Sequence, residues 1–517
     1  MPNKNTDALF QLIFSLEKSE KRHFKLYIKR SSAKEDLKII QLFDALDSMD
    51  DYDEKLLLKK LPFVTKPQLA NLKTHLYKQV LASLRLLKRA ENVDLQLTEH
   101  LDDARLLYNK GLKLQSLKIL ERAKEIAKAN HKFNFLAQVI SLEKKIETLH
   151  ITRSSNEKTL ALTEEALQIS THIDRVTRLS NLALLLYRWY IKNGHARNEE
   201  DSKDLDQFFK QQLPADIAGI TEFYELLYLY QSYCWYAFIR QDFLQYYRYS
   251  QKWIDLFDAD ASMIGVESGH YVKGMHNLLN AHFDLRNFPE FQKTLKKFEE
   301  YAASPLGNQH DNFRVHTFVY IASARINWHL MLGTFKEGLA LVPEIEAKLD
   351  EYAQYIDSHR VLVFTYKFAT LYFGSGDYSA SIDYLQKIIN GEGDLRIDLQ
   401  CYARLLHLMA HYELGNDDII ESLTKSVYRY MARMKNLTVV EEEMFRFLRN
   451  SFKLSPRQLK PEFEKFLTTI KHLERNRFET RSFVYLDVIS WLESKVYNKP
   501  LSTIIHDKYL ASKRRVG

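Results

Sequence analysis

The chain has 517 residues, 45% of them hydrophobic, which is long enough to bury one large core or several. Its 15 glycines and 10 prolines are few for this length, which disfavours turn-rich sandwiches and barrels and favours helices. The two cysteines exclude a disulfide framework, and without a signal peptide pattern or a long apolar run we expect a protein of the cytoplasm that does not enter a membrane.

Residues 1–90 hold the whole excess of positive charge. They contain 18 Lys and Arg against 11 Asp and Glu, which leaves 56 residues of each sign in the remainder. Hydrophobic periodicity predicts helices at 6–17, 19–30, 35–48, 53–61 and 66–89. Thr65 followed by Pro67 marks the start of the last one. We therefore predict a basic helical N-terminal domain over residues 1–92.

The second predicted helix bears a stripe of basic residues beside an apolar seam. We expect Ser19 to cap this helix. At 100° per residue, its basic side chains fall within a sector about 100° wide. They are Lys18, Lys21, Arg22, Lys25 and Lys29. Such a stripe suits a phosphate backbone or an acidic protein surface, and a solvated helix face is the alternative.

Residues 56–80 form a second candidate for nucleic-acid contact. A short helix, a turn and a longer helix that begins at Thr65 are similar to a helix-turn-helix. The turn lacks the usual Gly, and a leucine stripe continues along the longer helix, which indicates packing instead. Both interpretations stay open at this point.

One local pattern recurs from about residue 95 to 435: an apolar helix, a turn and a second amphipathic helix. The turns fall at Gly111, near 154–157, and at Gly194, Gln241, Arg286, Gly333, Gly376 and Gly415. The last five are separated by 45, 47, 43 and 39 residues. A helical hairpin has an apolar face that it cannot bury alone, so repeated hairpins stack into one continuous core.

The residues at these turns resemble the tetratricopeptide repeat (TPR) family. The family's turn has Gly, an aromatic residue two positions later and a small residue five positions later. The pattern occurs at Gly376 with Tyr378 and Ser381, at Gly333 with Phe335 and Gly338, and at Gly111 with Ser116. The repeats here are longer than the family's period of about 34 residues. The resemblance implies an all-α protein, with a right-handed α-solenoid of about eight TPR-like pairs over residues 93–435.

The register of this resemblance places a set of side chains in the concave groove of the solenoid. In the family's peptide-binding arrays, Asn and Lys at such positions hold the backbone or carboxylate of an extended peptide. The corresponding residues here are Tyr228, Gln231, Trp235, Lys273, His276, Asn280, Asn327 and Tyr366. The alternatives are core packing for the aromatic block at 221–253 and ordinary polar groove positions for the amides.

The segment after residue 436 predicts three further helices, which form a helical C-terminal cap at 436–517 with a short basic tail. Just before it, His407 and His411 lie one helical turn apart, which is a metal-ligand spacing. No third ligand stands out, so we interpret them as a packed pair. No motif indicates a cofactor, a metal or a catalytic constellation.

The sequence therefore favours a non-enzymatic scaffold or adaptor that binds a peptide or protein segment in the groove. The alternative is a nucleic-acid-associated regulator, transcriptional or RNA-binding. Its basic N-terminal domain would contact nucleic acid while the TPR-like array senses a partner.

Overall fold

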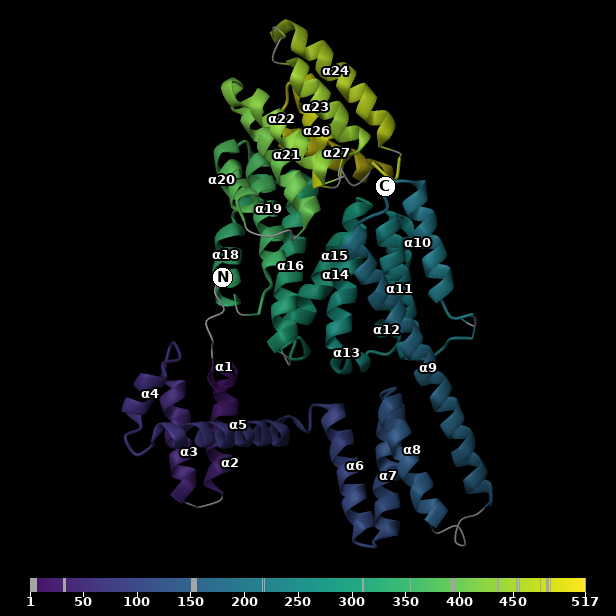
Figure 1. The fold of residues 1–517 in the computed structure, drawn as a ribbon. Helices are drawn as coiled ribbons and strands as arrows, with labels where there is room; N and C mark the ends of the chain where they lie inside the picture. The colour runs from purple at the N-terminus through teal and green to yellow at the C-terminus, as the bar shows by residue number, and fades with distance from the viewer. Residues whose placement is uncertain are drawn as a thin grey trace. The chain divides into compact units, whose positions relative to one another are not determined.

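The computed structural model describes the chain apart from residues 1–6, 31–33, 150–155, 216, 218, 309–310, 354, 392–395, 435–436, 452–453, 455, 475, 480–482, 484 and 517. Among the described residues every regular element is a helix and no strand occurs, which confirms the all-α prediction (Figure 1). The chain folds as two compact units, Met1–Ile173 and Asp174–Gly517. The domain boundaries expected at 92 and 435 stay predictions.

The first unit begins with the five helices expected for the N-terminal segment. They are α1 (Ala8–Ser15), α2 (Lys18–Lys29), α3 (Lys34–Asp47), α4 (Glu54–Lys60) and α5 (Lys66–Lys88). Thr65 caps α5 as predicted, in a reciprocal arrangement with Gln68. The expectation for Ser19 is wrong, because Glu17 caps α2 and Glu20 completes that capping box.

Three further helices and a long one follow in the first unit. They are α6 (Val93–Asn109), α7 (Lys113–Ala129), α8 (Phe133–Leu149) and α9 (Asn156–Asn193). The helix α9 begins in the first unit and ends in the second. The repeat step expected near 154–157 lies largely outside the described residues.

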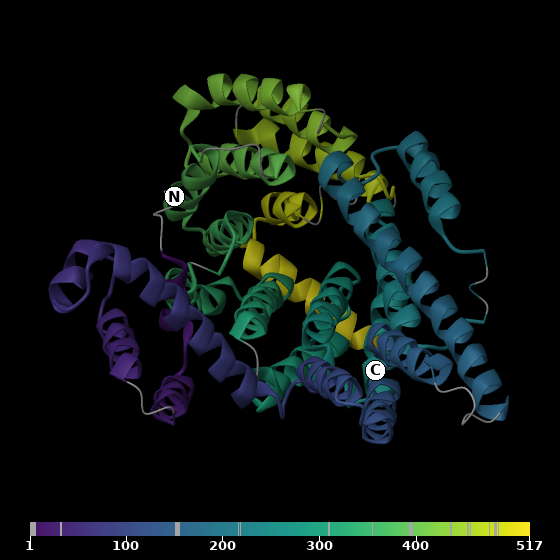
Figure 2. The same cartoon turned by 60° about the horizontal axis from the view of Figure 1, so that its bottom comes forward.

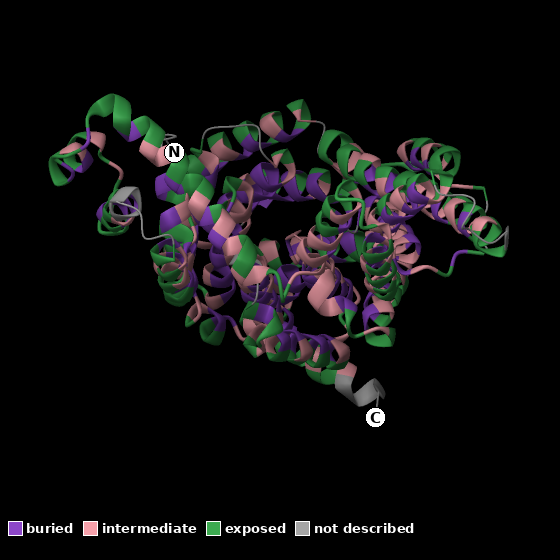
Figure 3. Cartoon of the chain, turned by 90° about the horizontal axis from the view of Figure 1, so that it is seen from below, coloured by how far each residue is buried: buried purple, intermediate pink, exposed green. Residues whose placement is uncertain are grey.

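The second unit continues as a run of antiparallel helix pairs. They are α10 (Glu199–Gln212), α11 (Phe223–Arg240), α12 (Phe243–Ala259), α13 (Met263–Val266), α14 (Ser268–Asp284), α15 (Phe288–Ala303), the short η2 (Leu306–Asn308), α16 (Asp311–Leu332), α17 (Phe335–Leu339), α18 (Val342–Glu351), α19 (Ser358–Ser375), α20 (Tyr378–Ile389), α21 (Ile397–Glu413) and α22 (Asp417–Arg433). Within the pairs the two helices pack on one another, as α11 does on α12 and α19 on α20, and α14 also packs on α16, and α19 on α21. Figure 3 shows buried residues on the sides of these helices that face other helices and exposed residues on the outer sides.

The helix pairs share one turn structure. All seven turn residues named from the sequence have left-handed backbone, with φ between 53° and 89°, including the non-glycine Gln241 and Arg286. At six of the seven, the next residue donates its N–H to the carbonyl five positions earlier, which is the Schellman motif. An example is the 3.0 Å bond from Asp377 N to Tyr372 O. The same turn occurs at His131, which the sequence pattern did not reveal.

A small residue five positions after the turn lets the two helices of a pair approach closely. The hydroxyl of Ser116 donates to the carbonyl of Ala104 at 2.8 Å, and that of Ser381 donates to Ala369 at 2.9 Å. Each bond joins residues that are twelve positions apart, so the same kind of contact occurs within two helix pairs that are far apart in the chain. At Gly338, an added Cβ would lie 2.9 Å from the Cβ of His329.

The C-terminal helices differ from the expected end cap in one respect. Those of the described residues are α23 (Val439–Ser451), α24 (Pro456–Leu473), α26 (Val488–Tyr497) and α27 (Leu501–Val516), so the expected basic tail is the end of a helix. This helix, α27, packs on α16 and α19, and Figure 2 shows it crossing that part of the unit in yellow. The rings of Phe288 and Tyr509 lie 4.8 Å apart, and His506 Nδ1 donates to the Leu332 carbonyl at 3.1 Å.

We predict that Gly333→Ala destabilises the protein more than Gly376→Ala does. Both glycines have left-handed backbone, and an added Cβ at Gly376 meets nothing within 4 Å, whereas at Gly333 it lies 2.5 Å from the Ser502 carbonyl of α27. The backbone term alone is worth about 1 kcal/mol, and the clash adds about 1–3 kcal/mol. Urea denaturation and limited proteolysis of α27 measure the difference. Equal effects of the two substitutions would contradict the contact between α27 and this turn.

Candidate functional site

The second unit contains a cavity of about 930 Å³. This volume lies at the upper end of the range of about 300–1,000 Å³ that is usual for ligand pockets. The first helices of successive pairs line it, namely α11, α14, α16, α19 and α21, together with the end of α9. Trp491 of α26 and Leu501 and Ile505 of α27 belong to a further wall. The C-terminal helices therefore contribute to the wall of the cavity.

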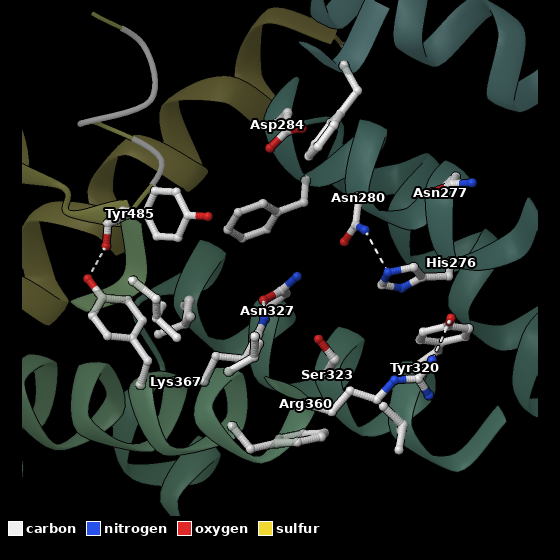
Figure 4. Close-up of a pocket in the computed structure, with 18 of the residues that line it drawn as sticks. His276, Asn277, Asn280, Asp284, Tyr320, Ser323, Asn327, Arg360, Lys367 and Tyr485 are labelled. Carbon is white, nitrogen blue, oxygen red and sulfur yellow. Dashed lines mark hydrogen bonds between the residues drawn. The ribbon is translucent and has the colours of Figure 1, made fainter. Parts of the chain in front are cut away.

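Polar side chains from three neighbouring helices meet in this cavity, among aromatic ones (Figure 4). Their three- and four-residue spacing places them on one face of each helix. They are Lys273, His276, Asn277, Asn280 and Asp284 of α14, Tyr320, Ser323 and Asn327 of α16, and Arg360 and Lys367 of α19. Aromatic residues including Trp235, Phe283, Phe364 and Phe373 supply apolar surface around them.

His276 is held as a neutral ring in the wall. It stacks on Tyr320 with ring centres 3.9 Å apart, and Asn280 donates its amide N–H to His276 Nε2 at 3.0 Å. Burial, together with the nearby cations Lys367, Arg360 and Lys273, lowers the pKa of His276 to about 3. This imidazole is thus a hydrogen-bond acceptor at neutral pH.

Two lysines face the cavity without a carboxylate partner. Lys367 donates to Asn327 Oδ1, and Lys273 lies 5.7 Å from the centre of the Trp235 ring. Among the described residues neither forms an ion pair. Burial lowers the pKa of Lys367 to about 7 and also lowers the pKa of Lys273. Both ammonium groups are available to an anionic ligand.

Asp284 contributes an unpaired carboxylate to the same cavity. No hydrogen bond or ion pair to its side chain occurs within the described part of the chain. Burial raises its pKa to about 7, and the charge of Arg286 opposes this shift. Asp284 and Lys367 are only half-buried, because the surface they keep is the wall of the cavity itself.

The structure brings together six of the eight groove residues named from the sequence. Those in the cavity wall are Trp235, Lys273, His276, Asn280, Asn327 and Tyr366. Tyr228 and Gln231 lie outside it and contact His270, which is in the wall. The Gln231 amide nitrogen is 2.8 Å from His270 Nδ1, and the Tyr228 and His270 ring centres are 5.6 Å apart. A binding role for all eight stays a prediction.

Sequence reasoning missed Asp284, Arg360 and Lys367. Lys367 stands alone in the apolar run VFTYKFATLYF, and an isolated charge in a buried helix is the signal that could have identified it. Tyr366, which was named, has its hydroxyl bound to the Tyr485 carbonyl at 2.9 Å. It therefore secures the C-terminal segment rather than offering a free donor.

The basic stripe of α2 is partly neutralised within the first unit. Lys21 pairs with Asp47 at 2.5 Å and Lys25 pairs with Asp44 at 2.6 Å, both carboxylates belonging to α3. The other members, Lys18, Arg22 and Lys29, are exposed and form no ion pair with a described residue. Three of the five predicted basic residues thus remain available to a partner.

His407 and His411 pack against each other. Their ring centres lie 4.5 Å apart, and burial lowers the pKa of His407 to about 4. Across the described ranges no cluster of three His, Cys, Asp or Glu side chains could hold a metal ion. Within the same ranges no helix is both long and apolar enough to cross a membrane.

Comparisons of the chain with protein-family models, with curated proteins and with solved structures find no significant match. The support for a function therefore comes from the geometry and charge of the cavity.

We predict that Lys367→Met stabilises the protein at neutral pH, by about 2 kcal/mol. The unfolded lysine, with its ordinary pKa of 10.5, binds a proton that the folded one loses above about 7. Burial of Lys367 therefore lowers the free energy of unfolding of the natural protein. This loss grows as the pH falls from 10.5 to 7 and is constant below 7.

Denaturation of the variant and of the natural protein between pH 6 and 10 tests this sign. The stabilisation should be largest at and below pH 7 and shrink towards pH 10. Lys293→Met, at a side chain that is 78% exposed, is the control and should show no such trend. If the free energies of unfolding of Lys367→Met and the natural protein differ by the same amount at every pH, the result would contradict the buried state of Lys367.

Proposed function

We propose that the second unit is a right-handed solenoid of TPR-like hairpins and that the protein is a non-enzymatic scaffold or adaptor. In this proposal the cavity holds a peptide or protein segment. The observation that carries it is the convergence of amide, hydroxyl and ammonium groups from α14, α16 and α19 on one cavity with aromatic walls.

The solenoid part of the proposal is supported by repetition at the atomic level. The Schellman turn recurs at the helix pairs, and the serine-to-carbonyl bond across twelve residues, from Ser381 to Ala369 in the second unit, also occurs from Ser116 to Ala104 in the first unit. First helices also contact first helices, as α14 does α16 and α16 does α19. Stacking of this kind presents one face of each first helix to a common concave side.

The polar groups of the cavity suit a peptide backbone. Asn280 uses its amide nitrogen for His276, which leaves its carbonyl oxygen as an acceptor. Asn327 uses its oxygen for Lys367, which leaves its amide nitrogen as a donor. A backbone needs both kinds of partner when it leaves water, because an unpaired amide costs free energy. The aromatic wall supplies apolar area for side chains.

Changing Asn280 and Asn327 together to Leu should reduce recovery of the bound partner about tenfold or more. Leucine has a similar size but offers neither donor nor acceptor, so the backbone of the ligand would lose both bonds. Crosslinking in the native cell followed by affinity purification and mass spectrometry measures the recovery. Asn450→Leu, at an exposed position of α23, is the matched control. Recovery of the same partners by the double variant would argue against the cavity as the binding site.

A nucleic-acid-associated regulator, transcriptional or RNA-binding, is the second candidate. It is favoured by the charge of residues 1–90 and by the exposed Lys18, Arg22 and Lys29 on one side of α2. The solvent face of α5 adds the exposed Lys78 and Arg85. The ion pairs of Lys21 and Lys25 with α3 reduce the charge that such an interface could use.

If this second candidate holds, reversing Lys18, Arg22 and Lys29 to Glu should strongly weaken binding of mixed-sequence nucleic acid at low salt. Each lost phosphate contact makes the slope of log affinity against log salt shallower by about 0.9. Fluorescence anisotropy at several salt concentrations measures both effects. Reversal of the exposed Lys293 and Lys296 of α15 serves as the control. If the unmodified protein does not bind nucleic acid at low salt, the proposal of a nucleic-acid-associated regulator is wrong.

A further inference from the structure

Two groups of opposite charge face one cavity without pairing with each other. Asp284 lies on α14 and Lys367 on α19, and Figure 4 shows them in separate parts of the lining with Asn280 and Asn327 between them. The pKa of Lys367 is lowered by burial alone, and that of Asp284 responds to burial and to Arg286. No hydrogen bond or ion pair joins these two described side chains, so the cavity has a positive pole at Lys367 and a negative pole at Asp284.

Several other charges in the wall have partners, whereas Arg286, two residues after Asp284, also lines the cavity, and its charge opposes the raised pKa of that carboxyl. Arg396 pairs with Asp398 at 2.7 Å, and Arg360 lies 3.6 Å from Asp357. The carboxylate of Glu267 accepts a hydrogen bond from the Tyr224 hydroxyl, and Asp487 accepts one from the backbone of Ser490. Lys273 joins Lys367 at the positive pole, because both cations act on His276.

We propose that the ligand is a short free peptide whose α-carboxylate lies at Lys367 and Lys273 and whose α-amino group lies at Asp284. This inference rests on the proposed function and narrows its ligand, because an internal protein segment has no terminal charges to offer. A charge that has lost water needs a counterion, and a zwitterionic peptide supplies one at each pole. The asparagines between the poles are placed for its backbone amides.

The protonation states of Lys367 and Asp284 should make the affinity for the ligand depend on pH. Burial brings the pKa of both Lys367 and Asp284 to about 7, so a bound carboxylate must keep Lys367 charged and a bound amine must keep Asp284 charged. Among the surrounding groups, burial and nearby cations lower the pKa of His276 to about 3, and burial lowers the pKa of Lys273. Burial also raises the pKa of Tyr246, on which the charge of Asp284 acts in the same direction.

A carboxylate-only ligand should therefore bind less well as the pH rises above 7, since Lys367 then loses its proton in the empty cavity. An amine-only ligand should bind less well as the pH falls below 7, since Asp284 then gains a proton. The two trends have opposite signs, which no single non-specific effect produces.

The test uses the full chain and four mixtures of random tetrapeptides: unmodified, N-acetylated, C-amidated and blocked at both ends. A fifth sample contains free amino acids. Binding is measured by native mass spectrometry and by isothermal titration between pH 6 and 8. We expect the unmodified peptides to bind at least tenfold more tightly than either singly blocked mixture. The acetylated and amidated mixtures should show the opposite pH trends given above.

Two variants test which end of the peptide lies at each pole. Asp284→Asn should bind unmodified and acetylated peptides equally, while still preferring peptides with a free carboxylate. Lys367→Met combined with Lys273→Met should bind unmodified and amidated peptides equally, while still preferring those with a free amine. Circular dichroism shows whether each variant folds, and Lys293→Met, which lies outside the cavity wall, is the control.

The outcomes separate this inference from the proposed function. Equal binding of fully blocked and unmodified peptides at the cavity would overturn the two poles and leave peptide binding standing. Tighter binding of free amino acids than of tetrapeptides would overturn the peptide assignment. If no mixture binds, both the inference and the peptide-binding function are wrong.

Discussion

The helix pairs of this chain depend on a tight turn in which one residue takes left-handed backbone. The turn ends the first helix, satisfies its last carbonyls through the Schellman bonds and reverses the chain within a few residues. A small residue five positions later then allows the second helix to lie close to the first, as Ser116 and Ser381 do. The first helices of five of these pairs, α11, α14, α16, α19 and α21, line the cavity.

Polar side chains in the cavity wall lower the stability of the folded chain. A folded chain gains little by holding Lys367 and Asp284 without counterions where burial moves the pKa of each towards the neutral form. Apolar residues of similar size would pack more favourably at both positions. Costly polar groups that converge on a cavity are typical of binding sites, since a ligand restores the missing interactions. The same reasoning does not extend to His407 and His411, which contact each other and remain neutral.

The C-terminal helices shape the site as much as the repeated pairs do. Tyr366 binds the carbonyl of Tyr485, Trp491 donates to Glu413 at 2.5 Å, and Ile505 packs into the core beside Phe335. Gly333 leaves room for the Ser502 carbonyl at the turn between α16 and α17. These contacts join segments more than seventy residues apart. In the first unit, the N-terminal helices have their own core around Phe24 and Phe43, whose ring centres are 4.7 Å apart, and α6–α9 contribute to a separate cluster.

The sequence by itself determined the helical class, the N-terminal helices and the turn positions. These features depend on neighbours within one or two helical turns, through hydrophobic periodicity, capping residues and glycine. It also pointed to six residues of one cavity, because repeat register is a local property. Only the tertiary structure decided that Lys21 and Lys25 are paired, that α27 returns to α16, and that Asp284 and Lys367 face the same space. Those facts depend on contacts between residues far apart in the chain, and no local pattern encodes which distant segment will supply the partner.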